Sequence, residues 1–242
     1  MRHGNNCCSK LLNEEKQCGI MLGESLEYLR HARFLNSHRS RNFQSNRYFK
    51  TGERTEKMRK NFGAKTWLYP MPVLIIGTYD ENGVPNAMNA AWGGIYDTNQ
   101  VMICLADDHK TTENIRKNKA FTVSFATAET VEACDYVGIV SANDVPDKLT
   151  RSGLKAAKSE FVNAPVIESL KVSVECELEK FNEDGICIGR IVNISADDSV
   201  LGDDGLIDVS KLKPIIYESA HHTYLALGAK VGNAFLDGKK IK

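Results

Sequence analysis

Residues 72–94 read PVLIIGTYDENGVPNAMNAAWGG, and this stretch indicates the fold class. Residues 73–79 form a short apolar run typical of a buried strand, and Asp80-Glu81-Asn82-Gly83 supplies a tight turn with an Asn-Gly pair. The chain then returns through residues 84–92, and one of two readings of its end closes this second strand with a turn at Gly93-Gly94. The pattern therefore predicts an antiparallel β-hairpin at the start of a β-rich domain.

The segments that follow extend this pattern. Strands are expected at residues 101–106, 121–125, 214–218 and 224–227, and a long hairpin at residues 172–178 and 186–194, where apolar and polar residues alternate. Helices are expected at residues 111–118, with Thr111 or Thr112 as N-cap, and at residues 129–140, with a loop of local helix over 143–163. Strands outnumber helices and hairpins dominate. A closed or partly closed antiparallel barrel removes exposed sheet edges and fits best.

The first 57 residues differ from the rest of the chain. They hold eleven Lys/Arg against six Asp/Glu, whereas residues 58–242 hold twenty against twenty-five. Residues 36–47 are rich in Arg, Ser and Asn without apolar periodicity, which is typical of disorder, and only residues 23–34 fit a weak amphipathic helix. We expect a basic, disordered extension at 1–57 and a folded domain at 58–242. The extension is an arm for RNA, anionic lipid or organelle targeting, or a dispensable tail, or the product of translation from an upstream start ahead of a true start at Met58.

Composition narrows the class of protein. The net charge is zero and no run of 18 apolar residues occurs, so we expect neither a nucleic-acid nor a membrane partner. Seven cysteines lack metal spacing, and Cys104 and Cys176 lie in apolar or alternating runs, where a thiol behaves as a small hydrophobe. An odd number of cysteines without a secretion signal predicts a cytoplasmic location.

The first candidate for ligand binding is residues 86–94, on and just beyond a strand. Small residues there allow a flat ligand to approach the backbone closely. Asn89 offers both a donor and an acceptor to a heterocycle, and Trp92 offers an aromatic wall. By itself the segment also fits a strand end packed by a core tryptophan.

The second candidate is residues 109–115, where a strand leads into a helix. Free backbone N–H groups and a partial positive charge at a helix start favour a phosphate, and His109 or Lys110 would add full charge. An ordinary capped helix explains the segment equally simply. Taken together, a ring platform about twenty residues ahead of a phosphate-type helix start suits a mononucleotide with a flat ring.

Residues 62–235 resemble the flavin reductase family with the FMN-binding split barrel, and most of all its flavoredoxin-like members. The resemblance is carried by residues 72–78, 86–94, 109–115, 121–124, 163–168, 175–178 and 224–228, in this order and spacing. It implies a six-stranded antiparallel Greek-key split β-barrel that forms a homodimer with one FMN per subunit near the interface.

The resemblance also implies a set of cofactor-binding residues. Asn89, Ala90, Ala91 and Trp92 would lie along the isoalloxazine, with Leu105 and Ala106 nearby, and His109, Lys110, Thr111 and Asn114 would hold the phosphate. Family members that carry an arginine in the phosphate loop differ from this chain, so His109 and Lys110 remain alternatives for that charge. His221-His222 is either a surface loop or a loop beside the flavin, and no third residue completes a metal site.

The function expected from these residues is an FMN-dependent oxidoreductase. NADH, NADPH or another donor would reduce FMN, and electrons would pass to free flavin, a redox protein or a monooxygenase partner. No catalytic side chain of the hydrolase type is expected, because the flavin carries the redox chemistry. The alternatives are a non-enzymatic FMN-binding electron shuttle or flavin sensor, and a barrel without flavin that acts as an interaction module.

Overall fold

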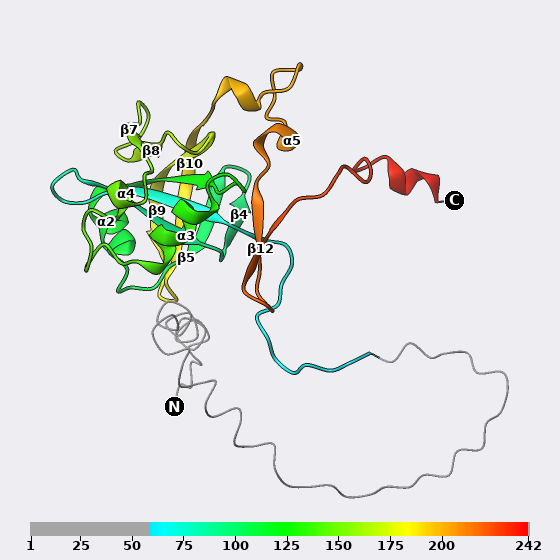
Figure 1. Ribbon diagram of the computed structural model, residues 1–242, viewed down its shortest axis with the longest axis horizontal. Helices are drawn as coiled ribbons and strands as arrows, with labels where there is room; N and C mark the ends of the chain where they lie inside the picture. The colour runs from blue at the N-terminus through cyan, green and yellow to red at the C-terminus, as the bar shows by residue number, and fades with distance from the viewer. Residues whose placement is uncertain (1–58, 242) are drawn as a thin grey trace, which may run out of the picture.

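A curled antiparallel sheet dominates the computed structural model, which describes residues 59–241 (Figure 1). The expected extension at 1–57 and its weak helix lie outside the described residues. The sheet order is β3-β2-β6-β9-β10-β5-β4. These strands are β2 (Leu74–Tyr79), β3 (Pro85–Ala90), β4 (Gly93–Asp97), β5 (Gln100–Cys104), β6 (Ala120–Phe125), β9 (Val172–Phe181) and β10 (Ile186–Ala196).

The remaining elements border this sheet. One small sheet is made of β1 (Met71–Pro72), β11 (Ile215–Glu218) and β12 (Thr223–Ala226), and a second of β7 (Ala156–Lys158) and β8 (Pro165–Ile167). The helices are α2 (Lys110–Asn118), α3 (Val131–Ile139), α4 (Lys148–Arg151) and α5 (Val209–Leu212), with 3₁₀ turns at Asp198–Val200 and Asp237–Lys240. None of the helices in residues 59–241 is long and apolar enough to cross a bilayer.

The two predicted hairpins form for local reasons. In the β2–β3 turn, Asp80 Oδ1 accepts hydrogen bonds from the backbone N–H groups of Asn82 and Val84, both at 2.8 Å, and Gly83 adopts a φ of 78°. That backbone conformation suits glycine, which lacks a Cβ. Asn182 plays the same part between β9 and β10, where its Oδ1 accepts from Ile186 N–H at 2.8 Å. Short-range side-chain bonds thus fix both reversals.

The curled sheet almost closes on itself. Its two edge strands, β3 and β4, follow one another in the chain and are separated only by Ala91 and Trp92. The Trp92 carbonyl accepts a hydrogen bond from Cys104 N–H at 2.8 Å, which ties this junction to the end of β5. Consecutive strands β5 and β6 are not neighbours, because α2 carries the chain between them, as expected of a Greek-key connection.

Strand β4 corrects the prediction that Gly93-Gly94 forms a turn. Both glycines lie in β4, and Gly93 pairs with Ile103 of β5. A Cβ on Gly93 would lie 2.8 Å from Leu74 Cδ1 and 2.9 Å from the Met102 carbonyl oxygen. The glycine therefore serves close packing rather than chain reversal, and the main sheet has seven strands instead of six.

Two cores lie on opposite faces of the sheet. The barrel interior is filled by side chains from β2, β3, β5, β6, β9, β10 and α2, namely Leu74, Ile76, Met88, Val101, Ile103, Leu105, Ile115, Phe121, Val123, Val174, Cys176 and Cys187. The second core lies under α3 and α4 and includes Val73, Ile75, Cys134, Val137, Leu149 and Ile215. The predicted buried role of Cys176 is confirmed, and burial raises the pKa of both the Cys176 and Cys187 thiols to about 12.

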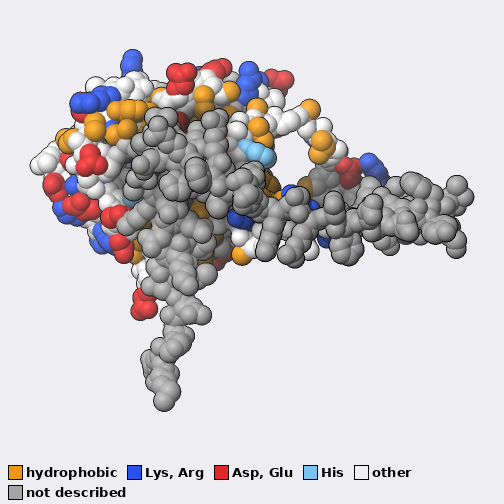
Figure 2. All heavy atoms as spheres, turned by 60° about the horizontal axis from the view of Figure 1, so that its bottom comes forward, with side chains coloured by type: hydrophobic (Ala, Val, Ile, Leu, Met, Phe, Trp, Pro, Cys, Tyr) orange, Lys and Arg blue, Asp and Glu red, His pale blue; other side chains and the backbone are white. Residues whose placement is uncertain are grey.

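The surface carries charges of both signs. On the face shown in Figure 2, acidic and basic side chains are interspersed with apolar ones over the barrel. The chain after β12 leaves the barrel, and its C-terminal end lies apart from it (Figure 1).

Candidate functional site

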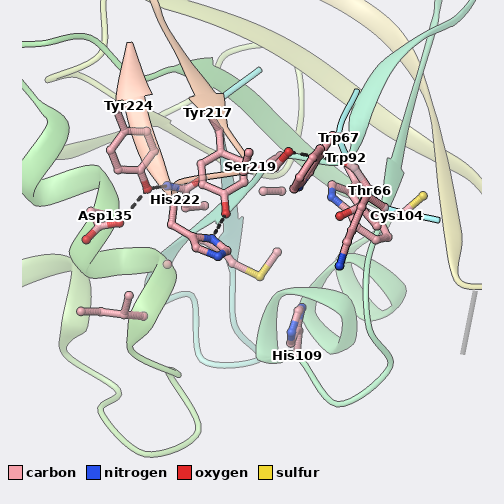
Figure 3. A pocket seen from close by; sticks show the side chains of 18 of the residues that line it. Thr66, Trp67, Trp92, Cys104, His109, Asp135, Tyr217, Ser219, His222 and Tyr224 are labelled. Carbon is pink, nitrogen blue, oxygen red and sulfur yellow. Dashed lines mark hydrogen bonds between the residues drawn. The ribbon is translucent and has the colours of Figure 1, made fainter. Parts of the chain in front are cut away.

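A cavity of about 740 Å³ lies beside the junction of β3 and β4. Six parts of the chain border it: the segment before β1, the end of β3 with the link to β4, the end of β5, the residue before α2, one side of α3, and the β11–β12 hairpin (Figure 3). The lining residues include Lys65, Trp67, Asn89, Ala90, Ala91, Trp92, Cys104, His109, Asp135, Gly138, Tyr217, His222 and Tyr224. The predicted ring platform at Asn89–Trp92 and the predicted helix start at His109 therefore border one cavity.

Asn89 is held by two neighbouring elements. Its side-chain N–H group donates to the Cys134 carbonyl of α3 at 3.2 Å and to the Tyr224 hydroxyl of β12 at 3.5 Å. Helix α3 lies close to β3 at this point, because a Cβ on Gly138 would lie only 2.8 Å from Asn89 Cβ. Asn89 is thus fixed in orientation by the two walls that flank it.

Tyr224 and Asp135 form a polar pair in the cavity wall. The Tyr224 hydroxyl donates to Asp135 Oδ1 at 2.6 Å (Figure 3). Burial, followed by the bond to this carboxylate, raises the pKa of Tyr224 above its ordinary value of 10.0. Tyr224 therefore stays a neutral donor at ordinary pH, and it links β12 to α3.

The adjacent histidines of the β11–β12 turn face different surroundings. His222 has a φ of 56°, lines the cavity, and its Nδ1 lies 2.7 Å from the Tyr217 hydroxyl. His221 is exposed, and its Nδ1 lies 2.8 Å from Glu218 Oε2. Of the two readings of this loop, a cavity-lining position holds for His222 and a surface position for His221. No group of three metal-ligating side chains occurs among residues 59–241.

Glu218 fastens the N-terminal segment to this hairpin. Its Oε1 accepts from the Tyr69 hydroxyl at 2.6 Å, and this bond, with further backbone and His221 donors, lowers the pKa of Glu218 to about 2. Strand β1 also pairs with β11, with Met71 opposite Tyr217. These contacts position residues 64–67, which supply one wall of the cavity.

Helix α2 begins one residue earlier than predicted. It spans Lys110–Asn118 with His109 as N-cap, so the prediction of a Thr111 or Thr112 cap is wrong. The Thr112 hydroxyl instead donates to the Ala106 carbonyl at 2.7 Å. The Thr112 N–H group donates to the His109 carbonyl at 3.0 Å, so only Lys110 and Thr111 carry backbone N–H groups ahead of the first intrahelical bond. The turn begins at the cavity beside His109.

The other predicted phosphate ligands use their side chains within the protein. Thr111 is buried, and its hydroxyl accepts from Asn86 Nδ2 at 3.0 Å. Asn114 is also buried and donates to the Thr78 hydroxyl at 3.1 Å. Lys110 Nζ lies 3.1 Å from Glu113 Oε2. Among the four residues predicted to hold phosphate, only His109 lines the cavity with its side chain.

Leu105 and Ala106 are buried where β5 leads toward α2. Leu105 belongs to the barrel core, and neither residue is among those that line the cavity. Cys104, which precedes them, is only partly buried and does line it. The change from cavity wall to barrel core thus falls between residues 104 and 105.

The residues at this site suit a flavin mononucleotide. Asn89 and the indole of Trp92 offer polar groups to a heterocycle, and Ala90 and Ala91 leave room for a flat ring close to the backbone. Where His109 and the start of α2 meet the cavity, hydrogen-bond donors and the partial positive charge of the helix start suit a phosphate.

Sequence reasoning missed part of the site. Asp135, Tyr217 and Tyr224 all line the cavity, yet none was singled out beforehand. One signal was present for Tyr224, which lies in a segment that carries the family resemblance. For Asp135, the apolar spacing of α3 predicts the helix but not which polar residue faces a ligand.

The curled antiparallel sheet is the architecture of the flavin reductase-like split barrels, as the comparisons with solved structures show. Flavoredoxin of Desulfovibrio vulgaris (Miyazaki F) superposes with a TM-score of 0.73 at 35% sequence identity, covering 75% of this chain and all of that chain. Flavoredoxin from Methanosarcina acetivorans, at 24% identity, gives a TM-score of 0.68 over 77% of this chain and all of that chain.

The family assignment rests on sequence comparison as well. The flavin reductase-like domain model matches residues 66–221. An uncharacterized protein of Aquifex aeolicus is 24% identical over 156 residues, which cover 60% of this chain and 79% of that protein. This chain belongs to the flavin reductase-like family, a family of flavoproteins, and the predicted family and fold class are confirmed.

Proposed function

We propose that this chain is an FMN-dependent oxidoreductase that receives electrons from NADH, NADPH or another donor and passes them to free flavin or a protein partner. The observation that carries the proposal is the meeting of two segments far apart in sequence, Asn89–Trp92 and His109, at one cavity. The similarity to a flavoredoxin at 35% identity supports the same reading.

The residues of the cavity have distinct roles in this proposal. His109 and the first-turn N–H groups of α2 bind the phosphate, since both donors and positive charge lie there. Asn89, whose two side-chain N–H bonds go to Cys134 and Tyr224, presents its side-chain carbonyl oxygen to the ring edge, and Trp92 covers the ring and excludes water. Bound FMN supplies the redox chemistry, and the protein supplies orientation and electrostatics.

The experiment that tests this function is an absorbance spectrum of the purified full-length chain. We expect flavin bands that persist after desalting, or that appear with a spectral shift on titration with FMN. Bleaching by NADH or NADPH faster than that of free FMN under the same conditions would support the enzyme. Binding without faster bleaching would support the electron shuttle or flavin sensor, and no binding of FMN would overturn both.

His109 gives the sharpest single-residue test of the phosphate position. A charge-assisted hydrogen bond contributes about 1.5–3 kcal/mol, so His109→Ala should weaken FMN binding by roughly tenfold or more when the imidazole is protonated. Riboflavin, which lacks the phosphate, should bind the variant and the wild type equally. A similar loss for both ligands would contradict a phosphate contact by His109.

We also propose that the functional form is a homodimer with the flavin near the interface. Trp67, Leu68 and Tyr69 expose apolar surface at and next to the cavity, and a second subunit would cover it. A specific dimer buries more than about 1,000 Å² in total. A monomer in sedimentation at micromolar concentration with FMN still bound would contradict this arrangement. The cytoplasmic location remains a prediction from the cysteine pattern.

A further inference from the structure

Residues 227–241 project from the barrel as an arm (Figure 1). The arm follows directly after β12, whose Tyr224 lines the cavity. Its apolar side chains lie in the open: Val231 is 102% exposed, Phe235 93% and Ile241 85%. Side chains this exposed make almost no contact with the barrel of their own chain.

The tip of the arm nevertheless has a defined local structure. Asp237 accepts from the backbone N–H of Asn233 at 2.7 Å and from Lys240 Nζ at 2.6 Å, and a 3₁₀ turn spans Asp237–Lys240. Phe235 lies within this loop at a φ of 62°. A bulky residue rarely adopts that conformation, so the loop holds the Phe235 ring in a costly position directed to solvent. A strained and exposed aromatic residue of this kind motivates the hypothesis that the segment makes a contact.

Charge indicates which surface the arm would contact. Residues 227–242 hold four lysines and one aspartate, whereas residues 59–226 hold sixteen Lys/Arg and twenty-four Asp/Glu. The arm is therefore basic and the domain that carries it is acidic. Opposite charge favours association and orients the partners as they approach. Because the arm leaves its own domain, the acidic domain of a second copy is the matching surface.

We propose that this C-terminal arm binds a second copy of the chain, with Val231, Phe235 and Ile241 buried against the acidic domain of that copy. The two copies then exchange arms around a two-fold axis, since each presents the same arm and the same domain. The arm starts at a cavity wall, so its anchoring also steadies β12. The proposal rests on the homodimer described above and adds the segment that holds it together.

Two variants test the arm by sedimentation of the full-length and altered chains. A chain ending at Leu227 and the substitution Phe235→Asp should each weaken self-association by at least tenfold. Circular dichroism should show an unchanged fold, because Val231, Phe235 and Ile241 are almost fully exposed and add little to the packing of their own domain. The matched control is Phe161→Asp, which alters another exposed phenylalanine and should leave association unchanged. Unchanged association in both arm variants would overturn the proposal.

Crosslinking identifies what the arm contacts. With the photoreactive analogue benzoylphenylalanine at position 235, mixed tagged and untagged chains should give a covalent dimer with both tag states. Crosslinks only within one chain would show that the arm folds back, which overturns the exchange. If the wild type is a monomer, both the dimer and the arm proposals fail. If the wild type is a dimer and the arm variants dimerise equally well, only the arm proposal fails.

Discussion

Helices α2 and α3 both reach the cavity, but different buried interactions hold them in place. Neutral side chains hold α2, with Asn114 bonded to Thr78 and Thr111 bonded to Asn86, all four of them buried. Helix α3 has, besides its contacts with Asn89 and Tyr224, a buried charge from α4 at its C-terminal end. The Lys148 ammonium, 3% exposed, donates to the carbonyls of Val137 and Val140 at 2.9 and 2.8 Å.

The difference shows what each helix can tolerate. A cation at a helix C-terminus satisfies the last carbonyls and interacts favourably with the helix dipole, but burial of its charge is costly. Uncharged hydrogen bonds carry no such cost and do not depend on pH. The buried contact at the end of α3 is therefore sensitive to protonation, while the buried contacts of α2 are not, and the Lys117–Glu81 ion pair of α2 lies at the surface.

The largest effect should come from Lys148 and appear as a dependence of stability on pH. Burial lowers the pKa of Lys148 from 10.5 to about 8. Between about pH 8 and 10.5 the unfolded chain keeps a proton on Lys148 that the folded chain has lost. The free energy of unfolding therefore increases as the pH rises through this range. This contribution is absent below about pH 8 and complete above 10.5, and it totals about 3 kcal/mol.

The measurement is urea unfolding from pH 7 to 9.5 for the wild type and for Lys148→Met. The buried Cys176 and Cys187 thiols are present in both proteins. Their contribution to the pH dependence therefore cancels when the two free energies of unfolding are subtracted. Across this pH range, the free energy of unfolding of the wild type should increase relative to that of the variant by at least about 1 kcal/mol. A difference that stays constant with pH would show that Lys148 is not held as an ammonium with a lowered pKa.

The next largest effect should come from Asn114→Ala in α2. The substitution leaves the Thr78 hydroxyl without its donor in a buried site and creates a small void, which costs about 2–3 kcal/mol. The melting temperature should fall by roughly 4–10 °C, equally at pH 7 and pH 9. Glu113→Gln, on the exposed side of the same helix, is the control and should change it by less than about 2 °C. A fall in melting temperature that differs between pH 7 and pH 9 for Asn114→Ala would contradict the difference proposed between α2 and α3.

A smaller loss is expected for Gly138→Ala, which tests the contact between α3 and β3. The new Cβ would lie 2.8 Å from Asn89 Cβ, so the helix has to move away from the strand. Overpacking of this kind costs about 1–2 kcal/mol. Because Asn89 moves with it, FMN affinity should fall as well, and calorimetric titration measures this. The paired control is Gly94→Ala, where no atom lies within 4 Å of the added carbon. An unchanged FMN affinity in Gly138→Ala would contradict the proposed role of Asn89 in FMN binding.

The smallest effect on stability is expected for Tyr224→Phe, which removes the bond to Asp135. The pair is only partly buried, so the loss should be about 1 kcal/mol. Its raised pKa means that Tyr224 stabilises the fold fully below pH 10.0 and that this contribution is lost as pH rises further. Unfolding at pH 9 and 11 should therefore show a smaller decline in the variant than in the wild type. An equal decrease in the free energy of unfolding in both proteins would contradict the stabilising bond between Tyr224 and Asp135.

Local patterns predicted most of the fold. Strands β2, β3, β9 and β10 follow from apolar runs and from the Asn-Gly and Asp-Gly turns, which act over a few residues. Strand β4 was missed, because Gly93-Gly94 carries a local turn signal while the reason for glycine there lies in Leu74 and Met102. Glycine selected for close packing and glycine selected for a turn are identical in sequence.

The candidate site divides in the same way. Asn89, Trp92 and His109 lie in compact motifs and could be found from sequence. Asp135 and Tyr224 are 89 positions apart and act as a pair only because α3 and β12 meet beside β3. Thr111 and Asn114 show the converse case. A helix start rich in polar residues suggests a ligand, yet their side chains bind Asn86 and Thr78, which periodicity does not reveal.

The two-residue link at Ala91 and Trp92 limits how the length of this chain can change as the protein evolves. An inserted residue there would shift β3 against β2 or β4 against β5, and a shift of one position turns every side chain of a strand to the opposite face. Longer insertions fit at exposed turns such as residues 202–206, where no strand of the barrel changes register. New loops can therefore diversify the rim of the barrel, while the spacing between β3 and β4 stays fixed.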